Sequence, residues 1–355
     1  MKTGQAIRRG MRSYGRSLLS GSLLVCCMSC TDWIYEDRSG CDRGVYLNFR
    51  YDYNLQRADM FSDHVGGVTV YVFDADGDFV TSRSEANTAG SAPLRAKDYR
   101  MHLDLPAGEY RFVALAMQKE VAETQRGPGA KFRIAGPDGG KMEGLSVTLD
   151  HAPDGRVEHG GLPLDTLWHA MSPRSVVTSD LYAVSETLSL VRDTKHIDVV
   201  LREIDDPAGV DVADYDFRIT DRNLRLRYDN SVDESGPAVY TPYVAWNTED
   251  RTGREAAEGV GRMAHVGFMT SRILYHDRAE EDAVLTVTHR ETGREVIRVN
   301  LADMLARLHA CSEQEFLDRG YDYRMTFFLK GDTWEAVDLE ISVLNWSRRI
   351  QNVIL

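Results

Sequence analysis

Short segments in which apolar and polar positions alternate follow one another along most of the chain. The first places Val45, Leu47 and Phe49 at alternate positions, with more polar residues between them. Because successive side chains of a strand point to opposite faces of a sheet, this period of two predicts strands with one buried face. Comparable segments lie at 68–73, 101–105, 110–114, 145–149, 188–190, 196–201, 217–220, 224–228, 283–288, 296–299, 325–329 and 339–346.

Two short helices are predicted between the later strands. The first follows Asn300, a residue type that caps helices, and its apolar side chains share one face. The second is predicted to run from Ser312, which forms a capping-box pattern with Glu315, to Gly320, a residue type that ends helices. The apolar face of the first helix comprises Leu301, Met304, Leu305 and Leu308.

Many short strands separated by turn residues are typical of β-sandwiches. A chain of 355 residues is long enough for two domains, and its 43% apolar content is enough to fill their cores. The strand pattern starts a second time near Asp193. We therefore predict an all-β protein of two tandem β-sandwich domains with short helical insertions. The predicted segments are 1–29, a polar tether at 30–43, and domains at 44–193 and 194–355.

Residues 1–29 have the composition of a secretory signal peptide. They hold five basic side chains and no Asp or Glu, and the run from Leu18 to Met28 is apolar apart from positions 20–22. A basic segment followed by an apolar run of this length is typical of such signals. The run is too short to span a bilayer core, which takes about 20 apolar residues. The sequence therefore predicts export.

A cysteine at the end of this segment predicts lipid attachment. Ser29 and Cys30 fit the rule that a small residue precedes the acylated cysteine of bacterial lipoproteins, and polar sequence begins directly afterward. Cys27, after Leu24 and Val25, is the alternative site. Several acyl chains on one cysteine give durable membrane anchoring, whereas one chain binds only marginally. We therefore predict a tethered protein that contacts the membrane through its N-terminal lipid.

The charge of the chain restricts its partners. Its net charge is −13, and removal of the five basic residues of the signal leaves −18 for the mature part. Such a surface repels nucleic acid and anionic lipid, so no nucleic-acid partner is expected. Cys41 and Cys311 are the two cysteines beyond the signal region. They can pair in an oxidising compartment or be two separate buried thiols, and the sequence leaves both possibilities open.

Motifs for catalysis or metal binding fail on inspection. Residues 74–78 (Asp-Ala-Asp-Gly-Asp) resemble the start of a calcium loop, but the glycine falls at the fourth position instead of the sixth, and a hairpin turn at Asp76-Gly77 explains them better. The ten histidines have no zinc-ligand spacing, and no nucleophile or phosphate-loop motif occurs. We interpret Cys311 as a core cysteine. We expect no catalytic residue, no metal, no cofactor and no small-molecule substrate.

Four tyrosines offer one possible binding feature. Tyr51, Tyr53, Tyr240 and Tyr243 lie in or beside predicted strands. They can form a stacking platform for a glycan, or pack at the edges of amphipathic strands. Packing is the interpretation that strand amphipathicity favours.

Several segments of the mature chain resemble, in order, the FimB-type fimbrial anchor lipoproteins of Bacteroidetes. A lipobox cysteine followed by the acidic tether Cys30–Asp37 is also similar to that family. The resemblance covers nearly all of the mature chain. The segments that carry it are GVYLNFRYDYN (44–54), ADMFSDHV (58–65), VTVYVFDADGDFV (68–80), LPAGEYRFVALA (105–116), TLSLVRDTKHIDVVL (187–201) and DFRITDRNLRLRYDN (216–230).

The resemblance implies a fold, a location and a partner. Its members are outer-membrane lipoproteins, lipid-anchored at the cell surface, that hold a fimbria to the cell. Their fold is two transthyretin-like β-sandwich domains, and the subunits of such fimbriae join by β-strand donation. The partners implied are fimbrial subunits. The alternative function is a surface adhesin or fimbrial tip subunit, built from the same sandwiches, that binds a host protein or a glycan.

The C-terminal tail is the candidate contact with a fimbrial subunit. It ends on aliphatic residues, whereas a frayed, solvated end would be polar. Two interpretations are open: the tail is the last strand of its own domain, or it is a strand offered to a neighbouring subunit. In the second interpretation the partner-binding residues are Ile350, Val353, Ile354 and Leu355.

We predict that Cys30→Ala removes the lipid, because the acylated thiol is lost, and that the protein then becomes soluble in the periplasm. Metabolic labelling with a palmitate analogue measures this, and Cys27→Ala is the matched control. Label that persists on Cys30→Ala and disappears from Cys27→Ala would place the anchor at Cys27.

Overall fold

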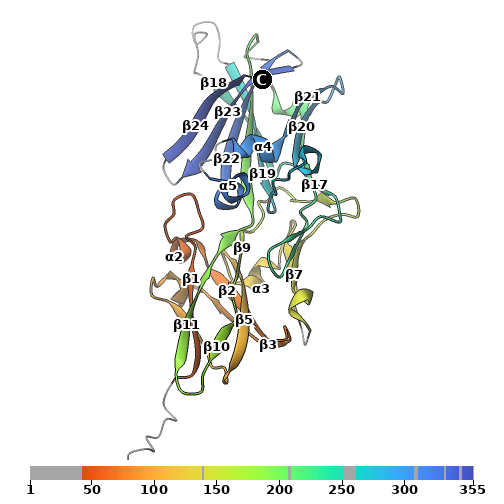
Figure 1. The fold of residues 1–355 in the computed structure, drawn as a ribbon. Helices are drawn as coiled ribbons and strands as arrows, with labels where there is room; N and C mark the ends of the chain where they lie inside the picture. Colours follow the sequence, from red (N-terminus) through yellow and green to blue (C-terminus); the bar gives the residue numbers. More distant parts are fainter. Residues whose placement is uncertain are drawn as a thin grey trace, which may run out of the picture.

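The computed structural model describes residues 42–137, 140–206, 209–250, 261–307, 311–331, 333–343 and 346–354. Strands make up most of these residues, and two lobes are stacked along the long axis of the molecule (Figure 1). The lower lobe in this view holds β1 (Gly44–Arg50), and the upper lobe holds the strands nearest the C-terminus. The predicted all-β sandwich architecture is confirmed.

Two sheets form the lower lobe. In the first, β1 lies between β11 (Ala183–Ser189), to which it is parallel, and β4 (Arg100–Leu103), to which it is antiparallel. The second sheet is antiparallel, and β10 (Val176–Thr178) also pairs with its strand β5. Its order is β12 (Val191–Arg192), β9 (Leu167–Met171), β5 (Gly108–Met117), β2 (Gly67–Asp74) and β3 (Phe79–Ala86).

The apolar positions that alternate in the sequence face a core between these two sheets. Val45 and Leu47 of β1, and Val70 and Val72 of β2, are completely buried in one cluster. The other face of β2 is covered as well, since Phe73 is completely buried and belongs to a second cluster. Val68, Val70 and Val72 therefore face one side of β2 and Phe73 the other, which agrees with the alternation in the segment 68–73.

Two sheets form most of the upper lobe, and the second cluster fills the space between them and continues into the lower lobe. The six-stranded sheet has the order β18 (Val244–Asp250), β19 (Gly261–Thr270), β13 (Lys195–Glu203), β22 (Asp322–Lys330), β23 (Thr333–Val343) and β24 (Trp346–Ile354). The five-stranded sheet has the order β21 (Glu295–Asn300), β20 (Val284–His289), β14 (Tyr215–Asp221), β17 (Ala238–Tyr240) and β8 (Arg156–Val157). The single strand predicted over 339–346 is wrong at its end, because β23 ends at Val343 and Trp346 begins β24.

A four-stranded sheet joins segments from the two halves of the sequence. Its order is β16 (Val232–Asp233), β15 (Arg225–Arg227), β7 (Ser146–Leu149) and β6 (Phe132–Ala135). β7 pairs with β15, and β8 pairs with β17. Strand pairing therefore crosses residue 193, and the division into domains at 44–193 and 194–355 stays a prediction.

The helices are short. They are α2 (Phe61–His64), α3 (Val121–Thr124), α4 (Leu301–Ala306) and α5 (Glu313–Arg319). Asn300 caps α4 as predicted, since its side chain accepts a hydrogen bond from the Asp303 amide at 2.8 Å. Among the described residues no helix has the length and apolar character needed to cross a membrane.

The predicted capping box of α5 is wrong. The helix begins after Ser312 and ends before Gly320, as expected, but the Ser312 side chain makes no capping hydrogen bond. Glu315 instead forms an ion pair with Arg319, 2.7 Å away and one turn later. The i to i+4 attraction of opposite charges explains why Glu315 points along the helix.

Residues 74–78 form the predicted turn between β2 and β3. The carboxylate of Asp74 accepts hydrogen bonds from the amides of Asp76 and Asp78 at 3.0 and 2.9 Å, and Gly77 has a φ of +76°. The Lys141 ammonium lies 2.9 Å from Asp78. A lysine therefore balances the charge of this acidic turn.

Candidate partner-binding edge

The tail that the sequence singles out forms β24 at one end of the six-stranded sheet. Its backbone pairs antiparallel with β23, with Ile350 opposite Leu339, Val353 opposite Val337 and Ile354 opposite Ala336. The structure thus brings Ile350, Val353 and Ile354 together on one edge strand. The other predicted site residues, Leu355, Cys30 and Cys27, lie outside the described residues.

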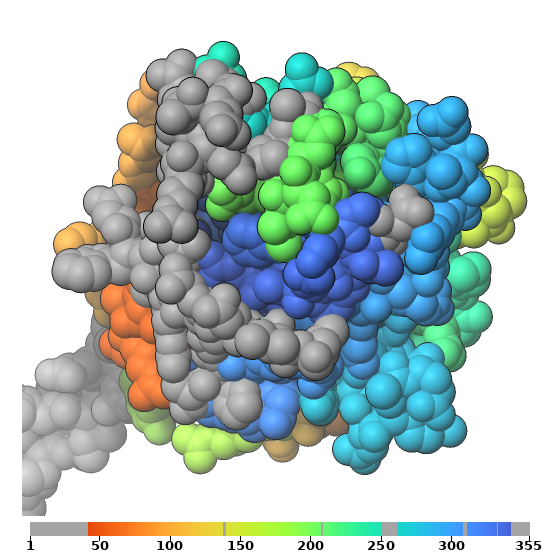
Figure 2. Space-filling model, turned by 90° about the horizontal axis from the view of Figure 1, so that it is seen from above, coloured from red at the N-terminus to blue at the C-terminus, as the bar shows by residue number. Residues whose placement is uncertain are grey.

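The strand next to β24 is fixed in the core. Val337, Leu339 and Ile341 of β23 are at most 1% exposed, and β23 pairs along its length with β22. β24 pairs with β23 alone in the described sheet, so its outer edge has no strand beside it there. Such an edge presents backbone N–H and C=O groups to which another chain can pair. In the view from above, residues of β22 and β23 (dark blue) lie beside the end of β13 (green) (Figure 2).

The opposite edge of the same sheet is β18. Val244 and Trp246 of this strand are 39% and 38% exposed. The Trp246 ring stacks on His265 of β19, with ring centres 5.1 Å apart and an 8° angle between the planes. Burial lowers the pKa of His265, so its ring favours the neutral form that stacks on an indole. This edge presents an exposed aromatic pair.

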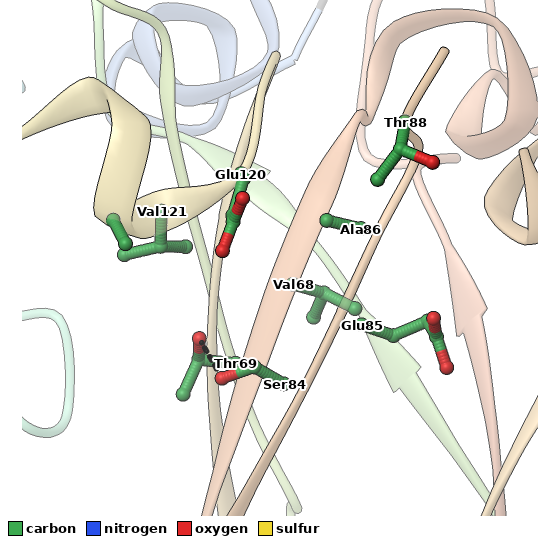
Figure 3. Close-up of a pocket in the computed structure, with 9 residues that line it drawn as sticks. Val68, Thr69, Ser84, Glu85, Ala86, Thr88, Glu120 and Val121 are labelled. Carbon is green, nitrogen blue, oxygen red and sulfur yellow. Dashed lines mark hydrogen bonds between the residues drawn. The ribbon is translucent and has the colours of Figure 1, made fainter. Parts of the chain in front are cut away.

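A depression of about 280 Å³ lies in the lower lobe between β2, β3 and the start of α3 (Figure 3). Its floor includes Thr69 and Ser84, whose hydroxyl oxygens are 2.9 Å apart and hydrogen-bond each other. Glu85 and Glu120 stand at its sides. The lining residues hold no histidine, cysteine or basic group.

The idea of a tyrosine platform is wrong for two of its members. Tyr51 and Tyr240 are completely buried, and Tyr240 donates a hydrogen bond to Asn223 at 2.7 Å. The half-buried Tyr53 lies under the Arg319 guanidinium, 4.0 Å from its ring centre. Tyr51, Tyr53 and Tyr240 therefore act in packing, which is the other interpretation of the sequence.

The described residues offer few other candidates for a metal site or a reactive side chain. No group of three or more His, Cys, Asp or Glu side chains there has a geometry that holds a metal ion. Cys311 is a free thiol at the edge of the second cluster and is half-buried instead of fully in the core. Cys41 lies outside the described residues.

Between the two lobes lies a mostly buried group of charged and polar side chains that sequence reasoning missed. We call it the junction, and its members are Arg192, Asp193, Lys195, Asn230, Arg272 and Asp318. Lys195, the first residue of β13, is 1% exposed. Its ammonium donates to the carbonyl oxygens of Arg192 and Asp318, each at 3.1 Å, and of Gly320 at 2.8 Å.

Ion pairs and amide contacts complete the junction. Arg272 binds both carboxylate oxygens of Asp318, each at 2.8 Å, and also donates to the Asn230 carbonyl. The Asn230 amide donates to one oxygen of Asp193 at 2.9 Å. The other Asp193 oxygen has no hydrogen-bond partner among the described residues.

Aromatic rings connect the junction to the lower lobe. The Arg192 guanidinium lies 4.2 Å from the ring centre of Tyr321 and 5.8 Å from that of Trp168. Trp168 is completely buried on β9 and meets the edge of Tyr51, just past the end of β1. Contacts of a cation with the face of a ring are stronger when the pair is desolvated. The two lobes are therefore held by packed rings as well as by ion pairs.

Burial displaces the pKa values of the junction in opposite directions. It lowers the pKa of Lys195, against the attraction of Asp318 and Asp193. It raises the pKa of Asp193, against the attraction of Arg272 and the hydrogen bond from Asn230. Beside them, burial lowers the pKa of His169 to about 4, although Nε2 of this ring lies 2.7 Å from the Tyr228 carbonyl. His169 is therefore neutral at pH 7 and donates from Nε2.

One signal in the sequence marks the junction. Arg192-Asp193-Thr194-Lys195 is a polar run between two apolar strand segments. A polar run between two apolar strands is more often a solvated loop than a buried connection between two lobes. Its partners Arg272 and Asp318 are far away in the sequence, and only the fold brings them together.

Comparison with solved structures defines the class of protein. A candidate adhesin from Bacteroides thetaiotaomicron has a TM-score of 0.70 and 29% identity, with 88% of this chain and 99% of that chain covered. The fimbrial anchor protein Mfa2 from Porphyromonas gingivalis has a TM-score of 0.55 and 18% identity, over 86% and 98% of the two chains. The fold is thus that of adhesin-like and fimbrial-anchor β-sandwich proteins.

Sequence comparison then gives the family. The family of fimbrillin-A associated anchor proteins Mfa1 and Mfa2 matches residues 38–352, and the chain belongs to this family. The minor fimbrium anchoring subunit Mfa2 of Porphyromonas gingivalis is 23% identical over 281 residues, which cover 77% of this chain and 74% of that protein. The resemblance noted in the sequence is confirmed, and membership indicates a structural, fimbria-associated protein.

We predict that Lys195→Met lowers the free energy of unfolding by roughly 3 kcal/mol, because three buried carbonyls lose their donor and two carboxylates lose a nearby positive charge. Urea denaturation followed by tryptophan fluorescence measures this. The matched control is Lys97→Met, which removes an exposed lysine. Equal effects of the two variants would show that the Lys195 ammonium contributes nothing to the junction.

A second prediction concerns acid. The pKa of His169 is lower in the folded chain than in the unfolded chain, so between pH 6.5 and about 4 only the unfolded chain binds this proton. Stability is therefore lost as the pH falls through this window. From pH 7 to 4.5, we expect the wild type to lose about 2–3 kcal/mol more than His169→Gln. Urea midpoints at both pH values test this.

The control for the acid experiment is His151→Gln, which changes an exposed histidine. This variant should keep the pH dependence of the wild type. If His169→Gln also keeps it, the buried imidazole is not a source of the acid sensitivity.

Proposed function

We propose that this protein is an outer-membrane lipoprotein, surface-exposed and without catalytic activity, that holds a fimbria to the cell. The observation that carries the proposal is the match of residues 38–352 to a family of fimbrial anchor proteins. The lipid is attached at Cys30, and the partner is a fimbrial subunit. The arrangement of the two lobes supports this, because the chain enters at one end of the molecule and β24 lies in the lobe at the other.

The proposed contact is a strand contact made by the tail. Residues 346–354 already have the extended backbone that β-augmentation uses, and they occupy an edge position with β23 as their neighbour. A tail that leaves β23 can pair with a strand of a fimbrial subunit through the same backbone groups. In such a contact, backbone hydrogen bonds give affinity, and the side chains on one face of the strand give the register. The proposed contact residues are Ile350, Val353, Ile354 and Leu355.

Deletion of residues 350–355 tests the contact. We expect a folded, lipidated protein that no longer retains fimbriae on the cell, because the donated residues are gone while the core strands through Ile341 are intact. Retention is measured by comparing fimbriae on cells with fimbriae in the culture medium. Unfolding of the truncated protein, or its loss from the membrane, would show that the tail belongs to its own core.

A disulfide between β23 and β24 distinguishes two ways in which the tail can bind: it leaves β23 to pair with the fimbrial subunit, or it stays on β23 and binds the subunit through its outer edge. Val337 and Val353 are direct partners in the β23–β24 register, so Val337→Cys with Val353→Cys can fix the tail to β23. If the tail is donated, the oxidised double variant releases fimbriae and a reductant restores retention. The single variants are the controls. Full retention by the locked protein would exclude donation.

A surface adhesin is the second candidate function, and the exposed Trp246–His265 stack on β18 favours it. An aromatic face of this kind can stack on a sugar ring or a partner side chain. Trp246→Ala separates the two functions, since an adhesin would lose binding to host cells while an anchor would still retain its fimbriae.

A further inference from the structure

Exposed apolar side chains gather at the lower end of the molecule. Val177, Leu181 and Tyr182 are 69%, 56% and 61% exposed, and we call them the apolar tip. The other exposed large apolar side chains of the described residues are scattered over both lobes: Val80, Leu162, Ile204, Val244, Trp246 and Tyr275. Single exposed apolar residues need no explanation, whereas three within six positions, one on β10 and two on the loop after it, indicate a contact surface.

The loop that carries the tip is held in place by hydrogen bonds. Thr178 Oγ1 donates to the Pro106 carbonyl at 2.6 Å, and Asp180 accepts from the Ala107 amide at 2.9 Å. The Ser179 hydroxyl accepts from the Leu181 amide at 3.1 Å. The three apolar side chains are therefore exposed on a paired strand and on an ordered loop instead of on a frayed one.

The tip lies where the chain enters the lower lobe. β11 begins at Ala183, directly after Tyr182, and Ala183 pairs with Gly44, the first residue of β1. Figure 1 shows the loop between β10 and β11 at the lower end of the ribbon, beside the start of β1. Residues 31–43 separate this point from Cys30. Thirteen residues span at most about 45 Å when extended, and about 20 Å as a flexible coil.

Three carboxylates around the tip have hydrogen-bond or ion-pair partners within the protein. Asp104 forms an ion pair with Arg43 at 2.7 Å, and Asp42 accepts a hydrogen bond from the Tyr46 hydroxyl. Asp180 is bound to the Ala107 amide, as described above. Glu109 has an exposed carboxylate and lies directly opposite Val177 in the pairing of β5 with β10. A carboxylate is costly in hydrocarbon, so Glu109 limits any membrane contact to the headgroup level.

We propose that the apolar tip rests in the headgroup region of the membrane that holds the lipid of Cys30, an inference that rests on the proposed lipid anchor. Leucine and valine contribute apolar area, and tyrosine has the amphipathic ring that favours a membrane interface. The tether raises the effective concentration of the bilayer at the tip, so a weak contact is sufficient. The contact holds the lower lobe against the membrane, with β24 in the lobe that faces away.

Photo-crosslinking of the intact lipidated protein tests the contact. Tyr182 is replaced by p-benzoylphenylalanine, and the full chain is reconstituted in phosphatidylethanolamine vesicles that contain an alkyne-bearing phosphatidylethanolamine. The matched control places the same amino acid at Tyr275, an exposed tyrosine of the upper lobe. We expect a lipid adduct from position 182 and none from position 275. Val177→Ser with Leu181→Ser should remove most of the adduct at 182.

The possible failures are distinguishable. Fatty-acid labelling before irradiation reports the anchor, and an unlabelled protein would overturn the lipid anchor and the tip contact together. A labelled protein that gives no lipid adduct at 182, or equal adducts at 182 and 275, would overturn the tip contact alone. A protein adduct at 182, to a second copy or to another membrane protein in cells, would overturn it in favour of a protein-binding surface.

Discussion

One buried ammonium group, that of Lys195, organises the charged junction between the two lobes, beside the apolar cluster that both lobes share. Its three acceptors come from the crossing between β12 and β13 and from the end of α5. Buried carbonyls need a donor, and the Lys195 ammonium supplies it where the side chain is 1% exposed. Because a lysine carries three N–H donors, one side chain satisfies carbonyls that belong to two different segments of chain.

The charge of that lysine requires the rest of the junction. A buried cation is costly unless anions lie close to it, and Asp193 and Asp318 supply them. Asp318 in turn is fixed by the bidentate contact with Arg272, and Asp193 by Asn230. Each buried charge is therefore compensated by a neighbour that is itself fixed by another contact. This network favours one relative arrangement of the lobes over a loose hinge.

The sequence predicted the strands well because a strand with one buried face follows a local rule. Val45, Leu47 and Phe49 alternate, and all three are buried in the cluster between the first two sheets. The pairing of strands follows no local rule. The parallel contact of β1 with β11 joins residues 44 and 183, and β7 pairs with a strand some eighty residues later. Those partners depend on the whole fold, so the alternation does not reveal them.

The candidate site shows the same limit. The aliphatic tail predicted a strand at 350–354, but the pattern does not give its neighbour, which the structure identifies as β23. Tyr51 and Tyr240 look amphipathic in the sequence and are completely buried, because Trp168 and Asn223 lie against them. The charges of the junction were missed for the opposite reason. Polar residues predict exposure, and burial becomes possible only when distant residues supply the partners.

The position of β1 has a consequence for a protein anchored as we propose. A pull on residue 44 acts along β1, away from Trp168, which Tyr51 contacts just past the other end of the strand and which lies against Arg192 of the junction. β1 is paired on both sides, with β11 over seven residues and with β4 over four. Hydrogen bonds between strands lie across the strand direction, so a lengthwise pull strains all of them together instead of one after another. A central strand is therefore a stronger attachment for the tether than an edge strand, and β24, at the edge of the distant sheet, is the one better placed to exchange its partner.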